Sequence, residues 1–336
     1  MRRRWYAACA GIRPRPVLGT GYALSPTYVL HWRMTTTLPR IVLVTRRTPL
    51  ESLLERFGTR GQVEFYLRSR GQDLSWAQGV HDKLYAALGE VQQAIPSYQR
   101  RVRIDRDDLD RFLFAPDDLV VIVGQDGLVP NVAKYLRGQL VIGINPDPRE
   151  YDGVLCRHPA KFAMPLLLFA CTPRGKDAAF TIQERCMALA RREDGQELRS
   201  LNEIFIGHAS HQSARYRITF GALKERHSSS GVIVATGTGC TGWARSIAEQ
   251  RHLEHPLPVA ADARLAWFVR EPFPSVVTGT SVNFGYLIDD TRLQLESEMD
   301  DGGVIFADGI ESDRVQFLTG QRCEIGIAPE RLRLVV

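Results

Sequence analysis

Runs of consecutive apolar residues punctuate the first half of the chain. Three of them, RIVLVT at 40–45, LVVIV at 119–123 and LVIGI at 140–144, show no polar alternation, which is typical of parallel strands covered on both faces. Segments with helical spacing of apolar residues lie between these strands, and this alternation predicts an α/β layer domain. The helical stretches are expected from about 48 to 88 and through 131–137, and a further strand is expected near 101–104.

Beyond about residue 159 the apolar runs become shorter and are separated by turn residues. This pattern is typical of a mostly antiparallel β domain with few helices. One helix is expected to begin at about Gly242, and the polar segments 228–230 and 300–303 are expected to form a turn and a hairpin turn. Strands are expected at 200–206, 216–220, 232–235, 264–269, 293–296, 304–306, 315–317, 323–327 and 332–335.

Residues 1–37 show neither helical nor strand periodicity and are rich in Arg, Pro, Gly and Tyr. We expect them to be a disordered leader or the result of a mis-assigned start, with Met34 as the true first residue, because the first convincing strand begins just behind it. The remainder is expected to divide into an α/β domain at 38–159 and a β-rich domain at 160–318.

The composition is that of a folded, soluble protein, with 44% hydrophobic and 24% charged residues among 336. No apolar run approaches the roughly 20 residues that a membrane-spanning helix requires. The net charge of +5 does not indicate a nucleic-acid partner, because nine arginines and no acidic residue fall within positions 1–50 and the rest of the chain is mildly acidic. Six scattered cysteines without a CxxC pair indicate a reducing compartment, so a cytoplasmic location is expected.

The segment VIVGQDGL at 121–128 is the sharpest local signal. A buried strand ends there in Gly-x-Asp-Gly just before a helix, and strand ends are where α/β sheets bind ligands. Gly124 and Gly127 can adopt positive φ and let backbone N–H groups approach a phosphate. Asp126 adds a carboxylate that can hold Mg²⁺ or accept a proton from a hydroxyl. The alternative is a plain strand-to-helix turn with an Asx cap.

A second segment, VIVATGTGCTGW at 232–243, also links a strand to a helix. Its hydroxyls and open backbone, next to the N–H groups at the helix start, suit a polyphosphate or a ribose. It matches neither the P-loop nor the dinucleotide GxGxxG motif. The alternative is a glycine-rich connection with N-capping threonines. The residues concerned are Thr236, Gly237, Thr238, Gly239 and Thr241.

The strand SLNEIFI at 200–206 carries a polar pair, Asn202 and Glu203. Such a pair is costly to bury unless it meets polar partners, so an amide beside a carboxylate suits the vicinal hydroxyls of a ribose. A solvent-facing strand end is the alternative. His208 and His211 have no third ligand placed by spacing, so no metal site is predicted there.

These motifs, taken in this order, resemble the NAD kinase family, which is related to diacylglycerol and sphingosine kinases. The resemblance rests on GQDG, LNE, TGTGCTGW, VIFADGI and the final RLRLVV, and it covers roughly residues 39–336. The stretches GINPDPREYDGVLCR, SLNEIFIG and SSSGVIVATGTGCTGW look most like the mitochondrial-type NAD kinases and their bacterial relatives. The resemblance implies an N-terminal α/β nucleotide-binding domain, to which a last segment at about 319–336 returns, and a C-terminal β-sandwich-like domain, with the active site in the crevice between them.

The resemblance also implies a reaction: ATP, with Mg²⁺, phosphorylates the 2′-hydroxyl of the adenosine ribose of NAD to give NADP. Asp126 would then orient and deprotonate that hydroxyl, and Asn202 and Glu203 would bind the NAD nucleotide. Trp243 would stack on an adenine. Relatives are commonly dimers or tetramers, so a homo-oligomer is expected. The other implied binding residues are Gly124, Gln125 and Gly127 near the ATP phosphates, and Thr236, Gly237, Thr238, Gly239, Thr241 and Gly242 in the second motif.

One motif departs from the family pattern, because GGDGT is replaced here by GQDGL at 124–128. Gln125 is expected either to obstruct the phosphates or to strain the loop by roughly 1–3 kcal/mol, and Leu128 removes a hydroxyl donor. Two alternatives to an NAD kinase therefore stay open. One is a kinase of another hydroxyl, on a lipid or a sugar, and the other is a nucleotide-binding sensor without catalysis.

Overall fold

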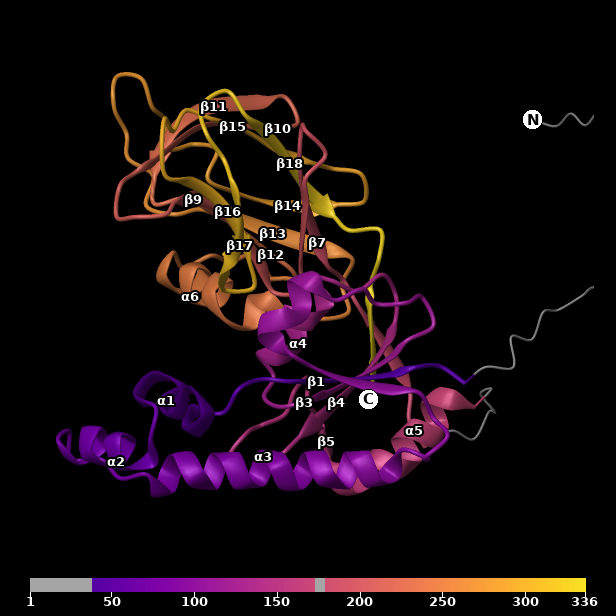
Figure 1. Ribbon diagram of the computed structural model, residues 1–336. Coiled ribbons are helices and arrows are strands. Elements are labelled where there is room, and N and C mark those ends of the chain that lie inside the picture. The colour runs from indigo at the N-terminus through magenta and orange to yellow at the C-terminus, as the bar shows by residue number, and fades with distance from the viewer. Residues whose placement is uncertain (1–37, 173–178) are drawn as a thin grey trace, which may run out of the picture. The chain divides into compact units, whose positions relative to one another are not determined.

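The computed structural model of this protein describes residues 38–172 and 179–336, and residues 38–336 form one compact unit. The expected leader at 1–37 lies outside the described residues. Within the compact unit, Figure 1 shows an α/β lobe built mainly from the first part of the chain and a lobe of stacked β-sheets. In the two described stretches, no helix is long and apolar enough to cross a membrane.

A mostly parallel sheet forms the α/β lobe. In spatial order its strands are β2 (Arg101–Asp105), β1 (Ile41–Thr45), β3 (Leu119–Val123), β4 (Leu140–Asn145), β19 (Leu332–Val335) and β6 (Ile182–Arg185), with β5 (His158–Pro159) also paired to β4. Only β6 runs antiparallel to its neighbour. The runs predicted as strands covered on both faces form β1, β3 and β4, and all their residues are buried.

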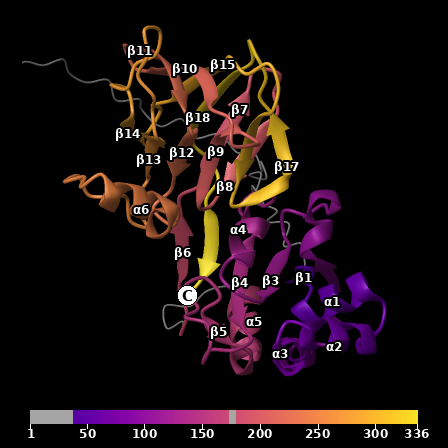
Figure 2. The ribbon, with the colours of Figure 1, turned by 90° about the vertical axis from the view of Figure 1, so that its left-hand side faces the viewer.

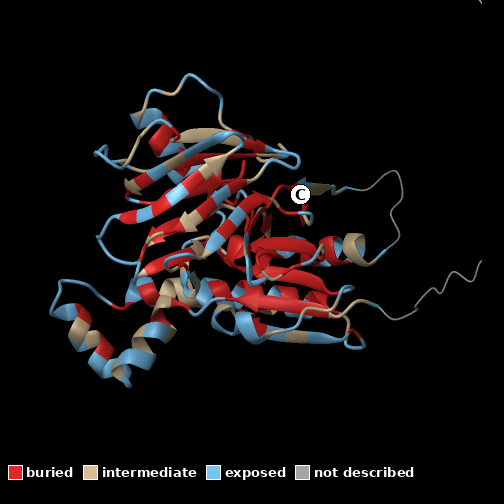
Figure 3. Cartoon of the chain, turned by 90° about the horizontal axis from the view of Figure 1, so that it is seen from above, coloured by how far each residue is buried: buried red, intermediate tan, exposed pale blue. Residues whose placement is uncertain are grey.

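Helices cover both faces of this sheet because successive side chains of its strands point to opposite sides. In β1, Ile41 and Leu43 pack against α3 and α5, whereas Val42 and Val44 pack on the side of α4. In Figure 3 the red of buried residues is concentrated on strands in the interior of the molecule. The helices of the lobe are α1 (Pro49–Phe57), α2 (Arg60–Arg68), α3 (Ser75–Ala94), α4 (Leu128–Ala133) and α5 (Ala163–Cys171), with short 3₁₀ turns at Arg106–Arg111 and Ala160–Phe162.

Two antiparallel six-stranded sheets form the β lobe, with a core that includes Tyr216, Trp267 and Phe317. This confirms the predicted combination of an α/β lobe with a sandwich-like β lobe. One sheet contains, in spatial order, β11 (Leu223–Ser229), β10 (Ala214–Phe220), β15 (Leu293–Ser297), β18 (Arg322–Ile327), β7 (Ala188–Arg192) and β8 (Glu197–Ser200). The other contains β14 (Phe284–Ile288), β13 (Arg264–Val269), β12 (Val232–Ala235), β9 (Glu203–His208), β16 (Gly303–Ala307) and β17 (Ile310–Gln316), and α6 (Trp243–Gln250) follows β12.

Three local expectations were wrong. The segment 300–303 is not a hairpin turn, because β15 and β16 lie in different sheets and the chain crosses from one to the other there. The strand expected at 200–206 is two strands, β8 and β9, with Asn202 in the bend between them. The expected turn at 228–230 is shorter, because β11 extends to Ser229.

A tight turn at Asp308 and Gly309 joins β16 to β17. Both residues have positive φ, 54° and 68°, as in the two-residue turns that join antiparallel strands with the natural twist. Asp-Gly is a preferred sequence for this turn, since glycine adopts positive φ without cost and Asp tolerates it. The turn therefore follows directly from the local sequence.

The last strand, β19, returns from the sandwich to the α/β lobe, where it lies between β4 and β6 (Figure 2). Strand β6 follows α5 and leads into β7 of the sandwich. These passages of the chain connect the two lobes at several points. The domain limits at 159 and about 319 stay a prediction, because residues 38–336 form one compact unit.

We expect Leu334→Ala to lower the free energy of unfolding by about 2–5 kcal/mol. Leu334 of β19 is fully buried in the core beneath α4, so the substitution leaves a cavity. Urea denaturation measures the loss. Leu223→Ala, at a residue of β11 that is 57% exposed, is the control and should change the value by no more than about 0.5 kcal/mol. Equal effects of the two substitutions would contradict a central position for β19.

Candidate functional site

A cavity of about 1000 Å³ brings together segments that are far apart in the sequence. Its wall includes Asp126 and Gly127 from the loop after β3, Asn202 from the bend between β8 and β9, and parts of the 236–241 loop after β12. The remaining wall comes from Pro130, residues 154–155, Arg185 and the segment from α6 to residue 260. The volume lies at the upper end of the range of about 300–1,000 Å³ for small-molecule pockets. We call this space the interlobe cavity.

The Asp126 carboxylate is held by three consecutive backbone N–H groups. Val154 donates to Oδ2 at 2.7 Å, and Leu155 and Cys156 donate to Oδ1 at 2.9 and 2.7 Å. A carboxylate offers about four lone-pair positions. These donors leave one position on Oδ2, and because Asp126 borders the cavity, a ligand hydroxyl can reach it.

A second carboxylate, that of Asp308, holds Asn202 in position. Asp308 accepts hydrogen bonds from the Ser200 hydroxyl at 2.7 Å and from the N–H groups of Leu201 and Asn202 at 3.1 and 2.7 Å. The β16–β17 turn thereby holds the bend that carries Asn202 on the cavity wall. Neither strand pattern nor motif spacing predicted this role for Asp308.

Glu203 lies beside Asn202 in the sequence but is not part of the cavity wall. Burial and the nearby Asp308 raise the pKa of Glu203 to about 7, and burial raises that of Asp308 to about 6. The structure therefore separates the predicted Asn-Glu pair. Only the amide faces the interlobe cavity, and the acid shares its surroundings with Asp308.

The loop at 236–241 is shaped by the hydroxyl of Thr236 and by close contact with the backbone of neighbouring segments. Thr236 is fully buried, donates to the Leu201 carbonyl and accepts N–H groups of Thr238 and Gly239. Gly237 and Gly239 are needed because a Cβ would lie 1.8 Å from the Val259 carbonyl oxygen and 2.2 Å from that of Asn202. The space expected for a phosphate at these glycines is thus filled by neighbouring backbone. The loop residues on the cavity wall are Gly237, Thr238, Cys240 and Thr241.

Trp243, at the start of α6, does not lie on the wall of the interlobe cavity. Its indole stacks on Phe205, with ring centroids 5.9 Å apart and planes 10° apart, and the Arg270 guanidinium lies 4.8 Å from the indole centroid. Gly242, just before it, is likewise absent from the wall. Stacking of an adenine on Trp243 therefore stays a prediction, and it would take place outside this cavity.

A second cavity, of about 370 Å³, lies on the other side of the GQDG loop and shares Gly127 with the first. We call it the N-lobe cavity. Its wall includes Gly124, Gln125 and Leu128, together with the basic residues Arg46, Arg47, Lys83 and Arg106. It is located at the carboxyl ends of β1, β3 and β4, where α/β sheets bind ligands.

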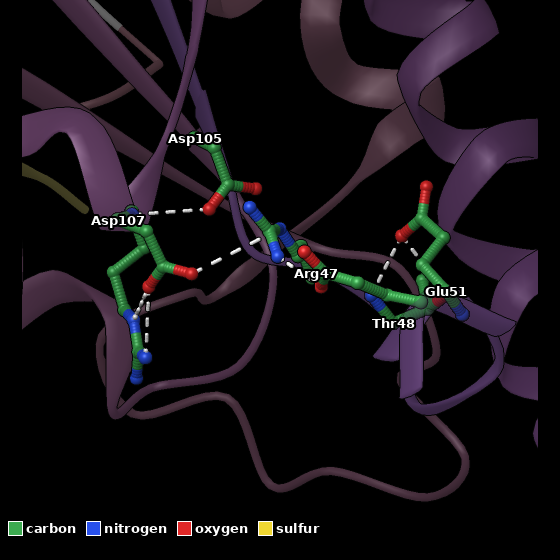
Figure 4. A network of polar contacts seen from close by, with 7 residues as sticks. Arg47, Thr48, Glu51, Asp105 and Asp107 are labelled. Carbon is green, nitrogen blue, oxygen red and sulfur yellow. Dashed lines mark hydrogen bonds and ion pairs between the residues drawn. The ribbon is translucent and has the colours of Figure 1, made fainter. Parts of the chain in front are cut away.

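Most cations of the N-lobe cavity already have acidic partners. Arg47 pairs with Glu55 and lies 3.9 Å from Asp107, beside the Thr48–Glu51 capping box that starts α1 (Figure 4). Lys83 bonds Asp147 at 2.5 Å, and Arg106 bonds Asp107 at 3.0 Å. Among the described residues Arg46 has no such partner and is exposed.

The backbone of the GQDG loop does not use the left-handed region. Gly124 and Gly127 do not adopt the positive φ that was open to them, and Gly127 has φ −62°. Gln125 also avoids the left-handed region and is exposed, so the expected backbone strain is absent, whereas obstruction of the phosphates by Gln125 stays a prediction. Leu128, the first residue of α4, packs into the core of the α/β lobe. The loop therefore accommodates GQDGL without distortion.

The chain is similar in structure to two NAD kinases. Yeast NADH kinase complexed with NADH matches with 13% identity and a TM-score of 0.56, over 89% of this chain and 84% of that one. An NAD kinase from Archaeoglobus fulgidus in complex with ATP matches with 16% identity and a TM-score of 0.51, over 88% and 92%. No protein-family model and no curated protein sequence matches. The chain thus has the fold of NAD kinases.

The raised pKa values of Glu203 and Asp308 predict a specific pH dependence of stability. In the folded chain the pKa values of both groups lie above their ordinary values of 4.5 and 3.8. The folded state therefore keeps these protons to a higher pH than the unfolded state does, and the free energy of unfolding should fall as pH rises from about 4 to 7. Glu203→Gln cannot ionise, so its stability should fall less over this range. In urea denaturation, the free energy of unfolding of the variant relative to that of the native chain should rise by about 1–3 kcal/mol between pH 4.5 and pH 8. A pH-independent difference would contradict the assignment.

Proposed function

We propose that this protein is an NAD kinase, which transfers a phosphoryl group from ATP to the 2′-hydroxyl of the adenosine ribose of NAD. The observation that carries the proposal is the meeting of Asp126, Asn202 and the 237–241 segment in one cavity of about 1000 Å³. The fold shared with two NAD kinases over most of the chain supports it. One of those neighbours is complexed with NADH and the other with ATP, the two ligand classes that the reaction requires.

In this proposal the two cavities hold the two substrates. NAD occupies the interlobe cavity, with its ribose hydroxyl at Asp126, and ATP directs its phosphates from the N-lobe cavity across the shared Gly127. Arg46 is the cation of the N-lobe cavity that forms no ion pair among the described residues, so its charge is available to a phosphate. Phosphoryl transfer depends mostly on positioning and neutralisation of charge, which such an arrangement supplies.

The reaction itself needs one proton acceptor. The 2′-oxygen attacks the γ-phosphorus, the bond from that phosphorus to the bridging oxygen of ADP breaks, and the hydroxyl proton passes to Asp126. The free lone-pair position on Oδ2 is the acceptor, because the other positions hold backbone N–H groups. Glu203 plays no part in this step, since it lies away from the cavity.

Mg²⁺ would enter as the ion bound to the phosphates of ATP. In the parts of the chain that the structure describes, no three His, Cys, Asp or Glu side chains gather as a metal cage requires. Asp107 and Asp147 of the N-lobe cavity are paired with cations. Because Mg²⁺ keeps several waters and prefers substrate phosphates, such a site is not needed. A cytoplasmic location and a homo-oligomeric state stay predictions.

Incubation of the purified chain with NAD, ATP and Mg²⁺ tests the proposal, with NADP measured by an NADP-specific dehydrogenase. Formation of NADP supports it. Parallel assays with NADH and with other phosphoryl donors define the substrates. Absence of NADP while NAD still raises the melting temperature would favour the nucleotide sensor. Absence of both, with phosphorylation of a lipid or sugar hydroxyl, would favour the other kinase.

Asp126→Asn should lower kcat for NADP formation by about 10²–10⁴-fold, because the amide cannot accept the hydroxyl proton. The amide NH₂ also faces a backbone donor, so the free energy of unfolding should fall by about 1–3 kcal/mol. Steady-state kinetics and urea denaturation measure the two effects. Asp117→Asn, an exposed acid in the same lobe, is the matched control and should change neither. An unchanged kcat in Asp126→Asn would exclude Asp126 as the proton acceptor.

A further inference from the structure

Arg185 is a buried cation on the wall of the interlobe cavity, at the end of β6. The residue is only 5% exposed. One terminal nitrogen donates to the Thr238 hydroxyl at 3.3 Å and the other to the Gln183 amide oxygen at 3.0 Å. The Nε atom is buried and has no hydrogen-bond partner among the described residues. Within the described residues, Arg185 thus donates hydrogen bonds only to neutral oxygens, and its Nε–H group has no acceptor.

Other buried cations of the described chain are neutralised by acids. Arg199, which is 7% exposed, pairs with Glu197 at 2.9 Å and with Glu330 at 3.2 Å. Lys134 pairs with Asp313 at 2.6 Å. Within the described residues, Arg185 has no acidic oxygen at ion-pair distance. This difference is informative because a buried charge is strongly destabilising unless a counter-charge compensates it.

The neighbours of Arg185 do not remove this imbalance. Burial and the like charge of Arg157 lower the pKa of the Arg185 guanidinium, yet arginine stays protonated in proteins. The Asp126 carboxylate is the nearby acid and partly offsets the charge of Arg185 through space, but it forms no ion pair with the guanidinium, and three of its lone-pair positions are taken by backbone N–H groups. Arg157 is exposed and forms no ion pair among the described residues. The direct ion pair that Arg185 lacks among the described residues can be supplied by an anionic ligand in the cavity.

We propose that Arg185 binds a phosphate group of the ligand in the interlobe cavity. A guanidinium presents planar donors that match phosphate oxygens, and Arg185 is part of the cavity wall with its charge in no ion pair among the described residues. Thr238, which already contacts Arg185, places a hydroxyl beside the same anion. The identity of the ligand as a dinucleotide rests on the proposed function, whereas the binding of a phosphate anion does not.

The phosphate has two possible sources in a dinucleotide. It is either the diphosphate bridge, present in both NAD and NADP, or the phosphoryl group added at the 2′ position, present only in NADP. The first source makes Arg185 a residue that positions the acceptor. The second makes it a residue that stabilises the transferred group. The two sources differ in which ligands lose affinity when the guanidinium is removed.

The test compares Arg185→Met with the control Arg199→Met, in the full chain. The melting temperature of each protein is measured without ligand and with inorganic pyrophosphate, NAD, NADP or adenosine. Calorimetry gives the affinity of each protein for each of these ligands. Without ligand, Arg185→Met should melt at or above the native temperature, because it removes an uncompensated buried charge. Arg199→Met should have a lower melting temperature, because Glu197 and Glu330 lose their cationic partner. Each ligand should still raise its melting temperature as much as it does for the native chain. Arg185→Lys keeps the charge without the planar donors and should have intermediate affinity.

We expect Arg185→Met to bind pyrophosphate at least tenfold more weakly than the native chain and to bind adenosine equally well. An equal loss for NAD and NADP identifies the diphosphate bridge, and a loss confined to NADP identifies the 2′-phosphate. The proposal is overturned if the native chain responds to no phosphate ligand, if Arg185→Met binds them all as the native chain does, or if adenosine is weakened as much as NAD. If the native chain makes no NADP but the pyrophosphate response still depends on Arg185, the proposed function fails and the anion site stands.

Discussion

Three consecutive backbone N–H groups converge on the carboxylate of Asp126, and the candidate site depends on this interaction. It ties the loop after β3 to the segment at 154–156, which follows β4, so the carboxyl ends of two neighbouring strands act as one rigid edge. Gly127, next to Asp126, borders both cavities. The position of this loop therefore decides how a donor in one cavity can face an acceptor in the other.

The same physical solution recurs at Asp308, whose carboxylate accepts two backbone N–H groups and a hydroxyl. In both cases a carboxylate accepts hydrogen bonds from donors of the chain and forms no ion pair with a described residue. Arg185, on the cavity wall, likewise forms no ion pair with a described residue. A cavity built in this way favours an anionic ligand, and nucleotides carry their negative charge on phosphates.

Much of the α/β lobe could be predicted because its strands are covered on both faces. Continuous apolar runs located β1, β3 and β4 to within one residue. The polar strand β11, LKERHSS, was missed, because it pairs at the edge of its sheet and exposes much of its length. The turn residues at 300–303 predict a hairpin, whereas the chain crosses between sheets there, because turn residues indicate a change of direction and not which sheet the next strand joins.

The sequence by itself determined the layer architecture, the tight turn at Asp308 and Gly309, and the motifs that supply Asp126, Asn202 and the threonine-rich loop. These follow from local burial patterns and from the conformational preferences of single residues. Only the tertiary structure decided that Glu203 leaves the cavity, that the loop glycines make room for backbone, and that Arg185 enters the cavity wall. The reason is that the compensation of a charge depends on which groups the fold brings within a few ångströms, and no periodicity along the chain records those distances.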